Sequence, residues 1–272
     1  MIPTISQVCS LNSPFEQDIE DYAAGQCRSV EVWMTKLENY LAESPVESVR
    51  QLLSDCDVWL PVASYQGGLL ASQGAARQEA WDLLARRLDL CAEVGIGTLV
   101  VACDVVGPLT QDLLDRTQVS LTQLAQRGGE SGVRIALEFQ GRSSWGNNLQ
   151  TAVALVEDTG SPHLGLCLDS FHFGVGPSKP SDLRYLTREN LFHVQLSDVA
   201  DTARELCSDA DRILPGEGDL EIDLLIDRLR DIGYQGCVSL ELMNPQIWQV
   251  SARQFGEIGM TALRKVLGQA QP

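Results

Sequence analysis

Four residues with oxygen-bearing side chains each end an apolar run of this sequence: Glu138, Asp169, Gln195 and Glu241. Such runs are typical of buried strands that deliver a side chain to a site. Three carboxylates that converge repel one another unless a cation lies between them. All-oxygen donors suit a hard or borderline divalent ion. The pattern therefore predicts one divalent metal ion, Mg²⁺ or Mn²⁺, with Co²⁺ and Zn²⁺ not excluded.

The spacing of these residues supports their convergence. Glu138 and Asp169 are 31 residues apart, Asp169 and Gln195 are 26 apart, and Gln195 and Glu241 are 46 apart. Each interval fits one βα unit, the last with an inserted loop, so parallel strands would bring all four to one edge. The alternative is that each is an ordinary capping or loop-facing side chain at a strand end.

The rest of the chain alternates short β-branched runs with longer segments of helical period, which indicates βα units. Pro61 is unusual for a central strand, and Gly95 is expected to end a helix. We expect strands at 4–9, 30–33, 58–62, 98–102, 134–138, 164–169, 191–195 and 237–241. We expect helices at 15–24, 37–41, 46–53, 76–94, 111–131, 149–158, 181–186, 222–232 and 251–267, and a non-helical loop at 174–180.

Eight βα units without a linker or a shift in composition predict one domain, residues 1–272, folded as a (β/α)8 TIM barrel of the α/β class. The active site would lie at the carboxyl ends of the strands. A doubly wound open sheet is the alternative. Against it, no GxGxxG motif opens the first helix, and the polar strand ends are spread over four strands.

Composition limits the partners and the compartment. The 37 acidic and 20 basic residues give a net charge of −17, which would repel nucleic acid and anionic lipid. The eight cysteines are dispersed, without CxxC spacing, and the sequence shows no signal peptide or long apolar run. We therefore expect a cytoplasmic protein that binds a small molecule and neither nucleic acid nor membrane. The oligomeric state stays open, and a homo-oligomer is compatible with the sequence.

Five motifs carry a family resemblance: LEF at Glu138, LDSFH at Asp169, HVQLSD at Gln195, LPGEGD at 214–219 and SLE at Glu241. Together they resemble the xylose isomerase-like TIM barrels, the sugar phosphate isomerase/epimerase superfamily. The resemblance is specific in the second half of the chain and rests on layout in the first. It implies that these four positions hold one divalent metal and that Glu138 and Glu241 act as acid and base. Gln195 departs from the histidine of many members.

The glutamine resembles that of bacterial 3-dehydroshikimate dehydratases in the same superfamily. His172 matches a substrate-facing histidine of the family, with a structural histidine as the alternative. Arg212 matches an anion-binding arginine, with a surface arginine as the alternative. Glu31 is typical of the second strand and is expected to support the site or the fold. His193 should lie on the same side of its strand as Gln195 but at another depth.

The chemistry expected from this site is proton removal beside a metal-polarised carbonyl, catalysed by Glu138, Glu241 and His172. The shared enediolate or enolate leads to epimerisation, isomerisation or dehydration. We rank an isomerase or epimerase of a sugar-like hydroxyketone first and a dehydratase of the 3-dehydroshikimate or inosose type second. A sugar-binding barrel without catalysis is a third reading. Endonuclease IV chemistry is disfavoured because its trinuclear zinc site needs many histidines and this acidic chain has three.

Overall fold

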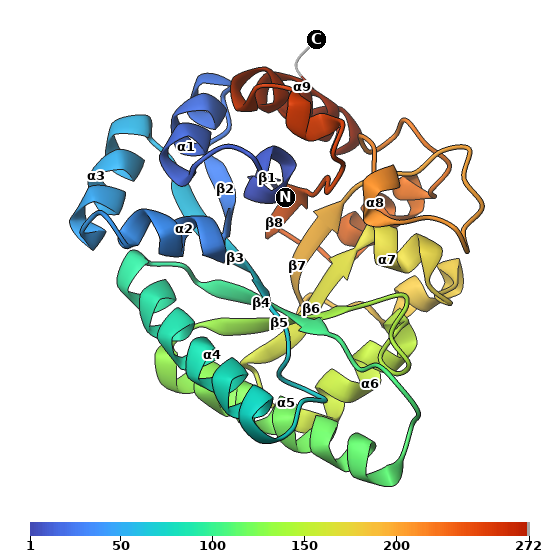
Figure 1. Ribbon diagram of the computed structural model, residues 1–272. Helices are drawn as coiled ribbons and strands as arrows, with labels where there is room; N and C mark the ends of the chain where they lie inside the picture. The colour runs from blue at the N-terminus through green and yellow to red at the C-terminus, as the bar shows by residue number, and fades with distance from the viewer. Residues whose placement is uncertain (271–272) are drawn as a thin grey trace.

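The computed structural model describes residues 1–270, and within these the chain forms a closed barrel of eight parallel strands (Figure 1). Neighbours in the sequence are neighbours in the barrel, and the last strand pairs with the first. The TIM barrel prediction is therefore confirmed, although residues 271 and 272 of the predicted domain lie outside the described residues. The strands are β1 (Ile2–Ser6), β2 (Ser29–Trp33), β3 (Trp59–Gln66), β4 (Thr98–Cys103), β5 (Arg134–Phe139), β6 (Leu164–Asp169), β7 (Leu191–Leu196) and β8 (Cys237–Leu240).

Helices surround the barrel as an outer ring (Figure 1). They are α1 (Phe15–Ala24), α2 (Met34–Leu41), α3 (Val46–Cys56), α4 (Gly74–Val94), α5 (Gln111–Ser131), α6 (Leu149–Thr159), α7 (Ser170–Val175), α8 (Ile222–Asp231) and α9 (Ala252–Val266). Short 3-10 helices occupy Gln7–Ser10, Pro180–Tyr185, Asp209–Asp211 and Ile247–Gln249. Between residues 1 and 270, none of the helices combines the length and the hydrophobicity needed to cross a membrane.

The apolar core has two layers, as the alternation of side chains along a barrel strand requires. The larger layer lies between the strands and the helices, where outward residues such as Leu137 and Leu168 pack. The smaller layer fills the inside of the barrel and includes Val62, Val100 and Ala136. Toward the carboxyl ends of the strands the inward positions become polar. The barrel thus supports a polar site on a packed apolar base.

Two of the predicted strands needed correction. The run at 4–9 is a strand only to Ser6, and Gln7–Ser10 turns into a buried 3-10 helix. The predicted strand 58–62 extends to Gln66. Pro61 fits within it because the register between β2 and β3 shifts there, with Trp59 opposite Ser29 and Val62 opposite Glu31. Pro61 has no N–H to donate, and at this bulge it is not required to form a hydrogen bond with β2.

The connections between elements also follow the sequence closely, with two exceptions. Gly95 ends α4 with a positive φ of 89°, as predicted for a C-cap glycine. The loop expected at 174–180 begins later, because α7 continues to Val175. The helix expected at 181–186 is the 3-10 helix Pro180–Tyr185.

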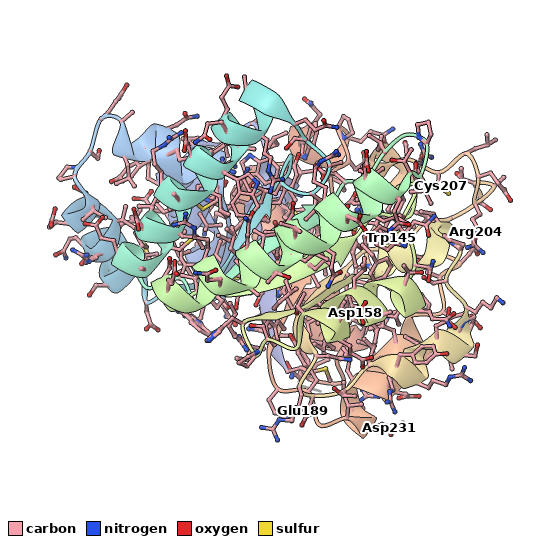
Figure 2. All side chains as sticks on the ribbon, turned by 90° about the horizontal axis from the view of Figure 1, so that it is seen from below. Trp145, Asp158, Glu189, Arg204, Cys207 and Asp231 are labelled. Carbon is pink, nitrogen blue, oxygen red and sulfur yellow. The ribbon has the colours of Figure 1, made fainter. Side chains whose placement is uncertain are left out.

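The two ends of the barrel differ in what they carry. Trp145, Arg204 and Cys207 belong to loops that follow strands, and they lie toward one side of the molecule in Figure 2. Glu189 and Asp231, which precede β7 and β8, lie toward the opposite side. The loops that follow β5 and β7 are joined where Arg142 donates a hydrogen bond to the carbonyl of Cys207. These loops cover the end at which active sites of TIM barrels form.

Candidate functional site

The four predicted strand-end residues lie at the carboxyl ends of β5 to β8. Glu138 is the penultimate residue of β5, Asp169 ends β6, Gln195 lies opposite Asp169 in β7, and Glu241 follows β8. Their exposed fractions are 6%, 0%, 1% and 5%. Since each side chain points inward from its strand, the barrel brings together oxygen-bearing groups that are far apart in the sequence.

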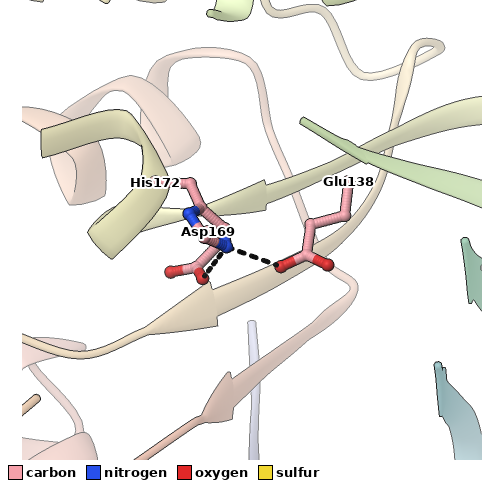
Figure 3. Close-up of side chains that lie close together, drawn as sticks. All are labelled: Glu138, Asp169 and His172. Atoms are coloured by element: carbon pink, nitrogen blue, oxygen red, sulfur yellow. Dashed lines mark ion pairs between the residues drawn. The ribbon is translucent and has the colours of Figure 1, made fainter. Parts of the chain in front are cut away.

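His172 joins Glu138 and Asp169 from the first turn of α7. Asp169 starts this helix, because its carboxylate accepts a hydrogen bond of 2.8 Å from the backbone N–H of Phe171. The turn carries the His172 ring back over the strand ends, with Nε2 at 3.7 Å from Glu138 Oε1 and 3.8 Å from Asp169 Oδ2 (Figure 3). Potential ligand atoms of these three residues all lie within 4.8 Å of one another.

The protonation of His172 follows from its hydrogen bond. Its Nδ1 accepts the backbone N–H of Gly141 at 3.4 Å, which assigns the proton to Nε2 on the side of the carboxylates. Burial lowers the pKa of His172 and Arg212 acts in the same direction, while Asp169 opposes both. A neutral ring with an N–H directed at the site can donate a proton there.

Arg212 is a buried member of the cluster, so the surface reading of this residue is wrong. Its Nη2 donates to Asp169 Oδ2 at 2.7 Å and its Nη1 to Glu241 Oε2 at 3.2 Å. Nη1 also donates to Ser197 Oγ, and Nε to Asp209 Oδ1. Burial works against its charge, but Asp169, Glu241 and Asp209 outweigh it and raise the pKa of Arg212. Four of its five N–H donors thus have acceptors among the described residues, which leaves one on Nη2.

The segment that carries Arg212 is fixed by a carboxylate that we did not predict. Asp198, buried just beyond β7, accepts hydrogen bonds from the backbone N–H groups of Gly216, Gly218 and Leu220 at 2.9 to 3.1 Å. Its backbone also forms an antiparallel bridge with Ile213. The acidic residue of HVQLSD and the glycines of LPGEGD, read separately in the sequence, are thus one structural unit.

The charges in this cluster do not balance. Burial raises the pKa of Glu138, and repulsion from Asp169 adds to it. Burial likewise raises the pKa of Glu241, with Arg212 opposing and Asp169 adding to the shift. When all three carboxylates are ionised they carry three negative charges, and Arg212 supplies one positive charge. The remaining two negative charges and the oxygen donors fit a divalent cation.

The side-chain oxygen of Gln195 faces Cys167, and its nitrogen faces the cluster. Its amide nitrogen donates to Glu241 Oε1 and Glu31 Oε1, both at 2.9 Å, and its Oε1 accepts from the Cys167 thiol at 3.0 Å. His193 lies one inward position deeper on β7, as expected, and its Nε2 is 2.7 Å from Glu31 Oε2. Glu31, which we expected to support the site or the fold, thus contacts both His193 and Gln195.

A cavity of about 540 Å³ opens over the ends of β2 to β5. Ala102, on its wall, lies opposite Glu138 in the pairing of β4 and β5. Trp33 and Tyr65 line it as a tilted aromatic pair with ring centroids 5.2 Å apart, and Asp104 and Gln140 add polar groups. The cavity therefore offers a small molecule an aromatic wall and polar groups, one strand away from Glu138.

Comparison with known proteins places the chain in a family. The family model described as "Xylose isomerase-like TIM barrel" matches residues 21–258, so the chain belongs to this family and the predicted resemblance is confirmed. An inosose isomerase of Halalkalibacterium halodurans is 36% identical over 135 residues, which are 49% of this chain and 48% of that protein. A 3-dehydroshikimate dehydratase of Pseudomonas putida is 28% identical over 266 residues, 93% of this chain and 40% of that protein.

The chain thus spans about half the length of the inosose isomerase and two fifths of the dehydratase in these matches. Among solved structures, a crystal structure of the IolI protein with a bound zinc atom aligns with a TM-score of 0.92 and 22% identity. The alignment covers 99% of both chains. At this level of identity the likeness shows a shared fold.

Proposed function

We propose that this chain is a divalent-metal-dependent isomerase or epimerase of a sugar-like hydroxyketone that works through an enediolate of the substrate. The single observation that carries the proposal is the buried group of three carboxylates with one arginine. Two of its three negative charges have no compensating cation among the described side chains, which makes the ionised cluster costly without a further positive charge. The named enzymes among the relatives, an inosose isomerase and a 3-dehydroshikimate dehydratase, agree with this class of chemistry.

The ion would be held by Glu138, Asp169, Gln195 and Glu241. We propose Mn²⁺, Mg²⁺, Co²⁺ or Zn²⁺, and the IolI structure of the same fold has a zinc atom. A divalent ion there would polarise a substrate carbonyl and acidify the adjacent C–H bond. Gln195 would have to turn its Oε1 away from Cys167 to take part.

The proton transfers are assigned to residues around the cluster. Glu138 lies opposite Ala102, which lines the cavity over β2 to β5, and Glu241 follows β8, so we assign removal of a proton to one carboxyl and its return to the other. Burial raises the pKa of both carboxyls, so each holds a proton more readily than an exposed carboxyl does, which suits proton exchange. His172 presents Nε2–H and acts as a proton donor to a substrate oxygen.

Dehydration is the second candidate. It is favoured by the match of 93% of this chain to a 3-dehydroshikimate dehydratase and by the donor orientation of His172, which suits protonation of a leaving hydroxyl. Arg212 would hold the substrate carboxylate in this reaction. Because only one N–H of Arg212 has no acceptor among residues 1–270, a bidentate grip on a carboxylate requires Arg212 to release Asp169 or Glu241.

The test is exchange of substrate C–H with deuterated solvent, followed by NMR, across ketoses, inososes and 3-dehydroshikimate. The metal-loaded chain should exchange one C–H of its substrate, and Glu138→Gln should abolish the exchange. Absence of exchange with every compound, together with absence of an aromatic product from 3-dehydroshikimate, would overturn both candidates. Absorbance of an aromatic product from 3-dehydroshikimate then separates them, since an isomerase or epimerase forms none. If product forms and Arg212→Ala leaves its rate unchanged, Arg212 does not hold the carboxylate.

A further inference from the structure

Glu31 is a fully buried carboxylate that reaches the site from β2, a strand that does not pair with β7. Its exposed fraction is 0%, as is that of His193. One oxygen of Glu31 is 2.7 Å from His193 Nε2, and the other accepts from Gln195 Nε2 at 2.9 Å. A single carboxylate therefore contacts both inward polar residues of β7, one at the level of the cluster and one below it.

The contact with Gln195 decides which way its amide faces. A carboxylate oxygen accepts hydrogen bonds and cannot donate them when ionised, so Glu31 selects the nitrogen of the amide. The other oxygen of Glu31 faces His193 Nε2 at 2.7 Å, and both side chains are fully buried, so the carboxylate is held in place from two directions. With one N–H of Nε2 donated to Glu31, the nitrogen and oxygen of the amide cannot exchange places, and Oε1 is the amide atom with lone pairs for a cation.

We propose that Glu31, held by His193, is a positioning residue that makes the oxygen of Gln195, and not its nitrogen, the group presented to the bound cation. The inference rests on the proposed function only in taking Gln195 as a ligand. Gln195 Nε2 bridges Glu31 and Glu241, and its Oε1 accepts from the Cys167 thiol. A divalent ion would be held by Oε1 if the amide kept its bond to Glu31 and gave up its contacts with Glu241 and Cys167.

The test is the affinity of the chain for Mn²⁺, measured by calorimetry, together with the visible spectrum of the Co²⁺ form. In Glu31→Gln the new amide can donate as well as accept, so it no longer distinguishes the two ends of Gln195. Loss of such a supporting contact typically weakens metal binding by about 10- to 100-fold. We expect a loss in this range and an altered Co²⁺ spectrum.

Asp18→Asn is the matched control, because it also disturbs a fully buried carboxylate, one that is paired with Lys36 and does not contact Gln195. It should lower stability and leave the Mn²⁺ affinity unchanged. The exchanged pair Glu31→Gln with Gln195→Glu restores a donor facing an acceptor and an oxygen facing the ion. It should bind Mn²⁺ more tightly than either single variant. His193→Gln, which loosens Glu31 without changing it, should give a smaller loss and serves if Glu31→Gln does not fold.

Native Mn²⁺ affinity and an unchanged Co²⁺ spectrum in Glu31→Gln and His193→Gln would overturn the inference, as would an exchanged pair that binds no better than the single variants. The proposed function fails differently. A native chain that binds Mn²⁺ but exchanges no substrate C–H overturns the proposed reaction and leaves the role of Glu31 standing. A native chain that binds no divalent ion overturns both.

Discussion

Two buried clusters of charged side chains in this barrel differ in how their charges balance. Near β1, Lys36 Nζ lies 2.6 Å from Asp18 Oδ2, and Ser10 and Gln7 donate further hydrogen bonds to the same carboxylate. This cluster pairs one negative charge with one positive charge. At the ends of β5 to β8, three carboxylates share Arg212.

The difference teaches how to separate a structural cluster from a functional one. A buried carboxylate that has a cation of its own and enough donors is satisfied within the fold. The cluster at the ends of β5 to β8 has fewer cations than carboxylates. One oxygen of Glu138 and one of Asp169 lie 3.7 and 3.8 Å from His172 Nε2, which is too far for a direct hydrogen bond. Because we propose that a divalent ion completes this cluster, substitutions there should change activity, whereas substitutions at the Asp18–Lys36 cluster should change stability.

The largest effect is expected at the functional cluster. Glu138→Gln and Glu241→Gln should each lower turnover by about a thousandfold or more, because each removes a side chain that we propose as both a metal ligand and an acid or base. The measurement is C–H exchange in deuterated solvent together with metal content. Asp18→Asn should leave turnover per folded molecule unchanged. Full activity after exhaustive chelation would contradict the metal-dependent assignment.

A smaller catalytic effect is expected for His172. His172→Ala removes the Nε2–H donor and should slow the reaction by roughly 10²- to 10⁴-fold, the usual contribution of a positioned acid. Metal occupancy, measured by elemental analysis, should stay close to native. A variant that unfolds readily but keeps its specific activity would assign His172 to the structure.

The balanced cluster should respond in stability. Lys36→Met leaves Asp18 buried without its cation, which typically costs about 3–5 kcal/mol in the free energy of unfolding. Urea unfolding followed by circular dichroism measures this cost. The activity of the folded fraction should be retained. A loss of turnover without a loss of stability would remove the distinction between the clusters.

The smallest effect is a dependence of stability on pH. Burial raises the pKa of Asp18 from its ordinary 3.8 to about 6, although Lys36 opposes the shift. A raised carboxyl pKa favours the folded state below pH 3.8, and this contribution is lost as the pH rises through 6. The loss is at most about 3 kcal/mol. The free energy of unfolding in urea should be measured between pH 4 and 7 for the native chain and for Asp18→Asn. The difference between the two should change with pH, and a difference that is constant over this range would contradict the prediction.

Much of this fold could be predicted from the sequence, because strands and helices alternate with clear periods. The limits of α1 and α5 agree with the prediction, since Pro14 precedes one and Thr110 caps the other. The end of β1 could not be predicted. Val8 and Cys9 remain fully buried in a 3-10 helix, and an apolar run carries the same pattern in either conformation.

The candidate site was predictable where it depends on strand ends and not where it depends on contacts between distant segments. The positions of Glu138, Asp169 and Glu241 follow from the register of parallel strands. The burial of Arg212 depends on a loop that returns to the barrel, and the pairing of Glu31 with His193 joins strands that are not neighbours. No local pattern encodes either contact, because both arise only when the barrel closes.

The anchoring of the β7 loop by Asp198 has a consequence for how this chain can diversify. Both the bridge to Ile213 and the hydrogen bonds to Gly216, Gly218 and Leu220 lie on the far side of the segment 200–208. Leu206 within that segment is 75% exposed. Insertions there can change the rim of the mouth while Arg212 keeps its place. The segment 200–208 can therefore vary in length while the guanidinium of Arg212 stays in position. A library of variants that differ in the length of this segment should change substrate preference without changing the cluster at the ends of β5 to β8.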